Sequence, residues 1–260
     1  MRSDILVDTD KNAVVMAQYN IPAKEMRLDS APLVILGYGL QRTHKNTPRL
    51  FSNISGSLER MGLTSLIYDY SIQQHDEQYL RTLCCECVVK DLNALFMWAR
   101  ENQYEKIAFI TEGLGAPFFF MNLPENTVFC VLLWPILDLD AFVTEQMNHI
   151  DHNQALCLDD HFLNNMTNKE LKPVLESVHV PTLILQGQQD QIVPPIHLEQ
   201  ARRHLMAPWL DITTFENGTH GLAHANHEKA SLQHIENFVK KYAQRDLLPK
   251  NTEMQKIFSV

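Results

Sequence analysis

The sequence predicts an α/β protein with a doubly wound, mostly parallel sheet, and three observations lead to this fold class. Short apolar runs rich in β-branched residues recur along the chain, as in strands buried on both faces. Longer segments between them carry apolar residues at helical spacing. The composition is globular, with 45% hydrophobic and 20% charged residues. We therefore expect a single domain over residues 1–260.

The expected strands follow one another along the chain as short runs of apolar residues. They are residues 13–16, 33–36, 65–68, 107–110, 128–134, 182–185 and 212–215.

Two stretches have the apolar stripe of an amphipathic helix that faces a sheet. Apolar residues recur every three to four positions from Leu80 to Phe96 and again from Leu232 to Tyr242. Residues 138–180 interrupt the alternation, with a short helix expected at 168–178. In a doubly wound sheet such an excursion lies over the carboxyl ends of the strands, so we expect residues 138–180 to form a partial lid.

The charge balance and the hydropathy argue against two classes of partner. The net charge is −9 and the pI is near 5.7, without a basic cluster, so we expect no nucleic-acid partner. The N-terminus has no signal-peptide core, and no apolar run approaches the roughly 20 residues that span a bilayer. We therefore expect no membrane partner and a cytoplasmic location.

Neither the cysteines nor the histidines have the spacing of a metal site. Cys84, Cys85 and Cys87 fall in the first expected helix, where adjacent cysteines do not readily pair, so we expect free thiols. The twelve histidines include no two-histidine motif with a general-base glutamate. We therefore expect no metal and no cofactor. Two loose clusters are the alternatives: His220 with His224 and His227, and Asp151 with His149 or His152.

A strand-to-helix turn follows the run at 107–110. There the apolar residues give way to Thr111-Glu112-Gly113-Leu114-Gly115 and then to a helix. This is the layout of a nucleophile elbow, in which a strained turn presents one side chain above the sheet. In the pattern G-x-S-x-G, Gly113 takes the place of the serine, so the nucleophile is missing.

Two later segments complete a pattern with this elbow. An apolar strand runs into Gly187-Gln188-Gln189-Asp190, and Asn217-Gly218-Thr219-His220-Gly221 follows the last strand. In this order of elbow, acid and base, the chain resembles the α/β-hydrolase superfamily, in particular its serine esterases and thioesterases. By element order the resemblance spans about residues 12–243.

The resemblance implies a site for an ester, a thioester or a similar acyl bond, and hence a small-molecule acyl substrate or ligand. His220 would act as base and then acid, and Asp190 would orient its ring. The amides of Tyr38 and Leu114 would form the oxyanion hole. The chain departs from the family pattern at Gly113, at Leu36 in place of a histidine, and in lacking Arg-Gly-x-Gly after Asp69.

Three functions are compatible with this pattern. The chain is an acyl hydrolase whose serine is replaced and which is inactive as written, a non-catalytic protein that binds a ligand or partner, or an enzyme that uses Asp190 and His220 alone as a general base. Glu112 would oppose negative charge in the oxyanion hole if it faced it, whereas a solvent-facing or salt-bridged glutamate would not. We expect no substitute nucleophile, because Thr111 should point into the sheet and Cys130 should be buried and inert.

Overall fold

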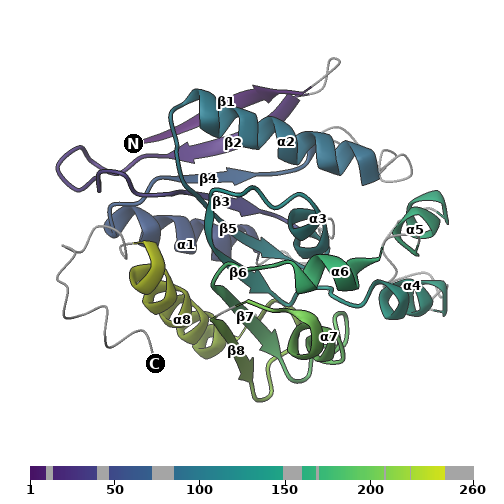
Figure 1. Cartoon of the computed structure of the whole chain (residues 1–260). Coiled ribbons are helices and arrows are strands. Elements are labelled where there is room, and N and C mark those ends of the chain that lie inside the picture. Colours follow the sequence, from purple (N-terminus) through teal and green to yellow (C-terminus); the bar gives the residue numbers. More distant parts are fainter. Residues whose placement is uncertain are drawn as a thin grey trace.

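The computed structural model describes residues 1–9, 14–39, 47–71, 85–148, 160–167, 170–207, 209–222 and 224–243. Within them, eight strands form one sheet in the order β1-β2-β4-β3-β5-β6-β7-β8 (Figure 1). The strands β1–β2 and β2–β4 are antiparallel, and every other neighbouring pair in this sheet is parallel. The strands are β1 (Arg2–Asp8), β2 (Val14–Asn20), β3 (Leu33–Gly37), β4 (Ser65–Tyr68), β5 (Ile107–Glu112), β6 (Thr127–Leu133), β7 (Thr182–Gly187) and β8 (Leu210–Phe215).

Helices connect the parallel strands, as the predicted fold class requires (Figure 1). They are α1 (Thr47–Arg60), α2 (Cys85–Glu101), α3 (Gly115–Met121), α4 (Leu139–Asn148), α5 (Asp160–Thr167), α6 (Leu171–Glu176), α7 (His197–His204) and α8 (Ala225–Ala243), with a 3-10 turn, η3 (His220–Leu222), before α8.

The two faces of the sheet are covered by different helices, which confirms the doubly wound architecture. Ser65 and Tyr68 lie three residues apart on β4, so their side chains point to opposite faces. The Ser65 hydroxyl bonds that of Ser55 on α1 at 2.7 Å. The Tyr68 ring instead packs against Phe109, which stacks on Phe119 of α3 with a centroid distance of 3.6 Å. Helix α8 lies beside α1, and α2 lies beside α3.

All seven predicted strands correspond to β2 through β8, and β1 is the strand that the sequence did not reveal. Its residues alternate between exposed and partly buried, because β1 lies at the edge of the sheet and α2 covers one of its faces. A search for continuous apolar runs misses such a strand. Residue 13, the first of the predicted strand 13–16, lies outside the described residues.

The predicted helices are present where the structure describes them. The stretch from Leu80 corresponds to α2, which is described from Cys85 onward, and the stretch from Leu232 corresponds to α8. The helix expected at 168–178 is α6, and residues 168–169 lie outside the described residues. The excursion at 138–180 contains α4, α5 and α6, and its residues 149–159 also lie outside the described residues.

The expectation of free thiols holds at two cysteines and is wrong at a third. Cys85 and Cys130 are buried and are not in a disulfide, and burial raises the pKa of the Cys130 thiol, as expected of an inert side chain. Cys87 is disulfide-bonded. Helix geometry hinders the pairing of adjacent cysteines only, so it does not keep Cys87 from bonding elsewhere.

In the described part of the chain, no helix is long and apolar enough to cross a membrane.

Candidate active site

The turn between β5 and α3 has the geometry of the predicted elbow. Gly113 has a φ of +50°, in the left-handed region that favours glycine. Its N–H donates to the Leu133 carbonyl at 3.1 Å, and its own carbonyl accepts from the amides of Ala116 at 3.3 Å and Ile136 at 3.1 Å. The N–H and the carbonyl of Gly113 are therefore both hydrogen-bonded, to the end of β6, to α3 and to the loop after β6.

The two glycines of this turn stand in different surroundings. A Cβ atom on Gly115 would collide with the Thr111 side chain, so the tight passage into α3 requires glycine there. A Cβ atom on Gly113 would have no atom of another residue, apart from its chain neighbours, within 4 Å. A side chain at position 113 would thus extend into open space.

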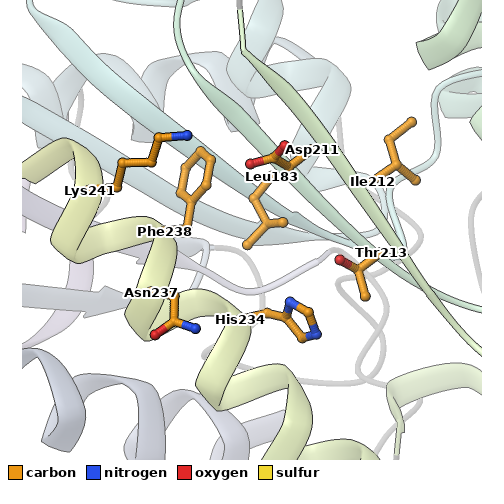
Figure 2. A pocket seen from close by; sticks show the side chains of 8 residues that line it. All are labelled: Leu183, Asp211, Ile212, Thr213, His234, Asn237, Phe238 and Lys241. Carbon is orange, nitrogen blue, oxygen red and sulfur yellow. The ribbon is translucent and has the colours of Figure 1, made fainter. Parts of the chain in front are cut away.

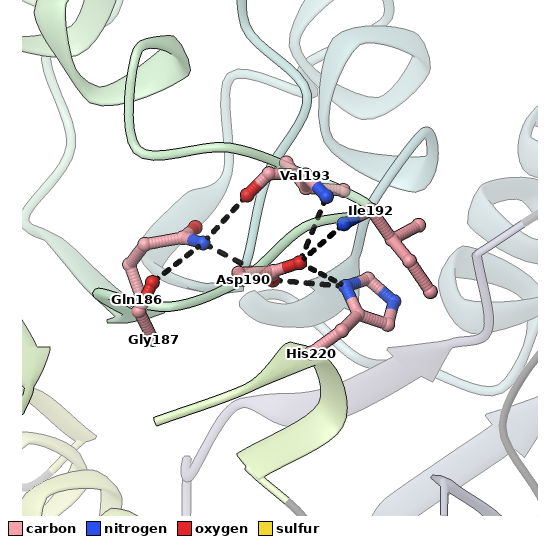
Figure 3. Close-up of polar contacts among 6 residues, drawn as sticks. All are labelled: Gln186, Gly187, Asp190, Ile192, Val193 and His220. Atoms are coloured by element: carbon pink, nitrogen blue, oxygen red, sulfur yellow. Dashed lines mark hydrogen bonds and ion pairs between the residues drawn. The ribbon is translucent and has the colours of Figure 1, made fainter. Parts of the chain in front are cut away.

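His220 and Asp190 lie together, as the sequence predicted (Figure 3). The His220 Nδ1 atom is 2.9 Å from Oδ2 of Asp190 and 3.1 Å from Oδ1, and both side chains are buried. Because an ionised carboxylate only accepts hydrogen bonds, Nδ1 is the donor of this contact, and in the neutral form of the ring it carries the single proton. The unprotonated nitrogen is then Nε2, the atom that a base in this position uses.

Asp190 is fixed by its own loop as well as by the histidine (Figure 3). Its Oδ1 accepts from the amides of Ile192 at 2.9 Å and Val193 at 2.8 Å. Its Oδ2 accepts from Nε2 of Gln186 at 3.2 Å, and that buried amide group also donates to the Val193 carbonyl at 2.9 Å. The carboxylate therefore has one orientation, facing the imidazole.

Two glycines bring the acid loop and the base loop into contact. Gly187 ends β7 and Gly218 precedes His220, and a Cβ atom on either one would lie 3.0 Å or less from the backbone of the other. Next to this contact, the Gln189 amide donates to the Gly218 carbonyl at 2.8 Å. This close approach places Asp190 beside His220, although 30 residues separate them.

The residues after β3 lie against the elbow. The Thr111 hydroxyl donates to the Gly37 carbonyl at 3.1 Å, so Thr111 points into the sheet as expected. The Tyr38 ring stacks on Phe51 with a centroid distance of 4.7 Å. The Gly39 amide donates to Oε1 of Glu112 at 3.1 Å. Glu112 is buried, with 5% of its surface exposed, so it does not face solvent.

Two further residues beside this site were not singled out from the sequence. Trp134 follows β6 with a φ of +38°, an uncommon backbone conformation for a bulky residue, and its ring centroid is 5.6 Å from that of His220. His197 is buried, and its Nδ1 accepts from the Asp138 amide at 3.1 Å. Burial lowers the pKa of His197 to about 4, against the opposing effect of the Asp138 and Asp190 charges. Both residues have apolar neighbours in the sequence, so no local pattern marked either of them as part of a site.

No group of three metal-ligating side chains occurs among the described residues. In the first alternative cluster, His220 bonds to Asp190, and the rings of His224 and His227 lie 5.4 Å apart. The second cluster, made of His149, Asp151 and His152, lies outside the described residues.

Two cavities differ in their relation to the site. The larger, of about 560 Å³, is formed by β1, β2, β4 and α1 and reaches Tyr38. The smaller, of about 280 Å³, lies between the edge strand β8 and α8 (Figure 2). It is lined by residues such as Asp211, His234 and Lys241, and by none of the residues predicted for the site.

Comparison with protein families gives one match. The model of the prolyl oligopeptidase family matches residues 128–246, which is less than half of the chain. This segment runs from β6 to the end of α8, so it includes Asp190 and His220 and begins after Gly113. No curated protein sequence matches the chain significantly.

Comparison with solved structures gives similar proteins over nearly the whole chain. Est1E from Butyrivibrio proteoclasticus has a TM-score of 0.74 at 15% identity, covering 92% of this chain and 98% of that chain. The esterase domain of a Rhodothermus marinus protein has a TM-score of 0.70 at 14% identity, covering 94% and 99%. Mouse alpha/beta hydrolase domain-containing protein 10 has a TM-score of 0.71 at 14% identity, covering 92% and 99%. Such identities establish a shared fold, and the activities named belong to those proteins.

Proposed function

The chain has the α/β-hydrolase fold, and from that premise we propose that it carries a serine-hydrolase-type acyl site without its nucleophile. The observation that supports this most is the buried pair of His220 and Asp190, 2.9 Å apart, in a chain whose elbow holds Gly113 at a φ of +50°. The substrate or ligand class is a small molecule with an ester, a thioester or a similar acyl bond.

Each role follows from what the side chain or the backbone can supply. A hydroxyl at position 113 would attack the acyl carbonyl, and Nε2 of His220 would take its proton and pass it to the leaving group. Asp190 would hold the imidazole, and the amides of Tyr38 and Leu114 would stabilise the oxyanion. Glycine offers no oxygen for the first step, so we infer that no acyl-enzyme forms in the present sequence.

The Gly113→Ser variant tests this proposal. It should hydrolyse a short-chain activated ester such as p-nitrophenyl acetate and should react with a fluorophosphonate at residue 113. Gly113→Ala is the matched control, because it adds the Cβ atom without the oxygen and should do neither. Addition of His220→Ala to Gly113→Ser should abolish both reactions.

The choice of acyl group can be guided by one of the similar structures. Est1E has also been solved with ferulic acid bound, at a TM-score of 0.73 and 16% identity. Aromatic esters such as ethyl ferulate therefore belong beside acetyl and thioester substrates in the panel. A folded Gly113→Ser variant that neither labels nor hydrolyses any of these substrates would favour a non-catalytic binding protein.

The open space at Gly113 supports a second candidate function, in which His220 and Asp190 act alone as a general base. A water molecule or a ligand hydroxyl would occupy the region of the absent serine oxygen and give its proton to Nε2 of His220. The wild-type chain would then turn over a substrate without a burst phase, and His220→Ala would abolish that turnover. Equal background rates for wild-type and His220→Ala proteins across the panel would exclude this function for those substrates.

A further inference from the structure

Residues 37–39 comprise the last residue of β3 and the two residues after it, and Gly37 and Gly39 are hydrogen-bonded to residues that precede Gly113. The Gly37 carbonyl accepts from the Thr111 hydroxyl at 3.1 Å. The Tyr38 carbonyl lies near the start of α3, 3.6 Å from where a Cβ atom on Gly115 would stand. The Gly39 amide donates to the Glu112 carboxylate at 3.1 Å. The 37–39 loop is therefore hydrogen-bonded to Thr111 and Glu112, directly before the elbow glycine.

The contact between Gly39 and Glu112 is close in the backbone as well as in the side chain. A Cβ atom on Gly39 would lie 3.0 Å from the Glu112 carbonyl oxygen and 3.1 Å from its Cγ atom. A side chain at position 39 would therefore require the loop or Glu112 to shift by a few tenths of an ångström. Glycine at this position lets the Gly39 amide reach the carboxylate.

The burial of Glu112 makes this hydrogen bond energetically significant. Only 5% of the residue is exposed, and a buried carboxylate is strongly disfavoured unless it is paired or hydrogen-bonded. A hydrogen bond to an ionised acceptor is roughly twice as strong as one between neutral groups. An ionised Glu112 would therefore hold the Gly39 amide more firmly than a neutral side chain would.

We propose that Glu112 is a positioning residue that fastens the 37–39 loop to the elbow through the Gly39 amide, and thereby sets the direction of the neighbouring Tyr38 amide. Its importance for chemistry rests on the proposed function, in which the Tyr38 amide is an oxyanion donor. An ionised carboxylate would have a second effect of opposite sign, because a negative charge beside the oxyanion hole opposes the charge that forms there. Glutamine separates the two effects, since it keeps an acceptor oxygen and removes the charge.

Amide hydrogen exchange at Gly39 tests the fastening without any need for turnover. The wild-type protein is compared with Glu112→Gln and Glu112→Leu under native conditions. The protection of the Gly39 amide should fall in the order Glu, Gln, Leu, with a loss of about tenfold or more in the Leu variant. Thr111→Val is the control, because it removes the bond to the Gly37 carbonyl and leaves the acceptor of the Gly39 amide in place.

The graded order keeps the test decisive even if the Leu variant does not fold, because Glu112→Gln alone should lower the protection at Gly39 measurably. Protection equal to wild type in Glu112→Gln, and in Glu112→Leu where it folds, would overturn the proposal. So would an equal loss at every amide of β5 and α3, since that result means general destabilisation.

The rate of fluorophosphonate labelling in the Gly113→Ser background tests the consequence for the site. Glu112→Gln should label at least as fast as Gly113→Ser alone, because it retains the acceptor and removes the opposing charge. Glu112→Leu should label about tenfold more slowly or worse, as expected when one oxyanion donor is displaced. A purely structural role would slow both variants in proportion to their loss of thermal stability, and that result would overturn the positioning role.

Loss of Gly39 protection in the Leu variant, together with no labelling in any Gly113→Ser protein, would instead contradict the proposed function. The proposed bond between Gly39 and Glu112 as a fastening of the loop would still stand.

Discussion

The Nδ1 atom of His220 contacts both carboxylate oxygens of Asp190, at 2.9 and 3.1 Å, inside a buried network. Replacement of Asp190 by Asn substitutes an amide that can donate a proton to Nδ1 and so favour the other tautomer of the ring. In the Gly113→Ser background, we expect Asp190→Asn to lower kcat for an activated ester by about 10⁴-fold. Steady-state hydrolysis measures the effect, and circular dichroism checks the fold. A loss below about tenfold would show that Asp190 does not orient the base.

Alanine should destabilise the protein at both glycines of the elbow, for two different physical reasons. Gly113→Ala adds a Cβ atom in open space and should cost about 1 to 2 kcal/mol of unfolding free energy, from the left-handed backbone alone. Gly115→Ala collides with the Thr111 side chain and should cost about 1 to 3 kcal/mol from overpacking.

A double variant identifies the source of the second cost. Thr111→Ala removes the atom with which the new methyl group collides, so Gly115→Ala should cost clearly less in that background than in the wild type. Urea unfolding of the four proteins gives the coupling free energy. Additive free-energy changes would mean that the Thr111 contact is not what excludes a side chain at position 115.

The sequence predicted the candidate site best where a polar or small residue follows a strand with a clear apolar run. Asp190 and His220 follow strands whose apolar runs stand out, and the small residues around Gly113 predict a tight turn. Because the carboxyl ends of parallel strands meet at one edge of the sheet, the pairing of Asp190 with His220 could be predicted as well.

What could not be predicted depends on contacts between distant segments. The Glu112 carboxylate accepts from the Gly39 amide, 73 residues away, and nothing near Glu112 in the sequence indicates this contact. The lowered pKa of His197 follows from its burial, and its Nδ1 atom accepts from the amide of Asp138, 59 residues away. Trp134 reads as the end of a strand, whereas its positive φ turns the chain beside His220.

The stacked rings of Phe109 and Phe119 should be a major contact between the sheet and α3. Both are fully buried, with centroids 3.6 Å apart, and Phe119 also lies near Phe96. We expect Phe119→Ala to lower the unfolding free energy by about 3 to 5 kcal/mol in a urea titration. Met97→Ala on α2 is the control, because its side chain is 63% exposed and its loss should change stability by less than about 0.5 kcal/mol. Similar losses for the two variants would contradict the buried position of Phe119.

The buried imidazole of His197 makes a prediction about stability at mildly acidic pH. Burial lowers its pKa to about 4 in the folded protein, whereas the unfolded chain should titrate near about 6.5. Between these values the unfolded state binds a proton that the folded state does not, so the unfolding free energy falls as the pH is lowered through 6.5 and levels off below 4. A difference of this size corresponds to about 3 kcal/mol over the whole window.

His197→Gln retains an acceptor for the Asp138 amide and cannot titrate, so it should lack this contribution to the pH dependence. Urea unfolding of both proteins from pH 7.5 to pH 4.5 should therefore show the wild type losing stability faster than the variant. Since the carboxylates and the other histidines titrate in both proteins, their contributions cancel in the difference. Parallel curves would mean that His197 is charged in the folded state or is not buried.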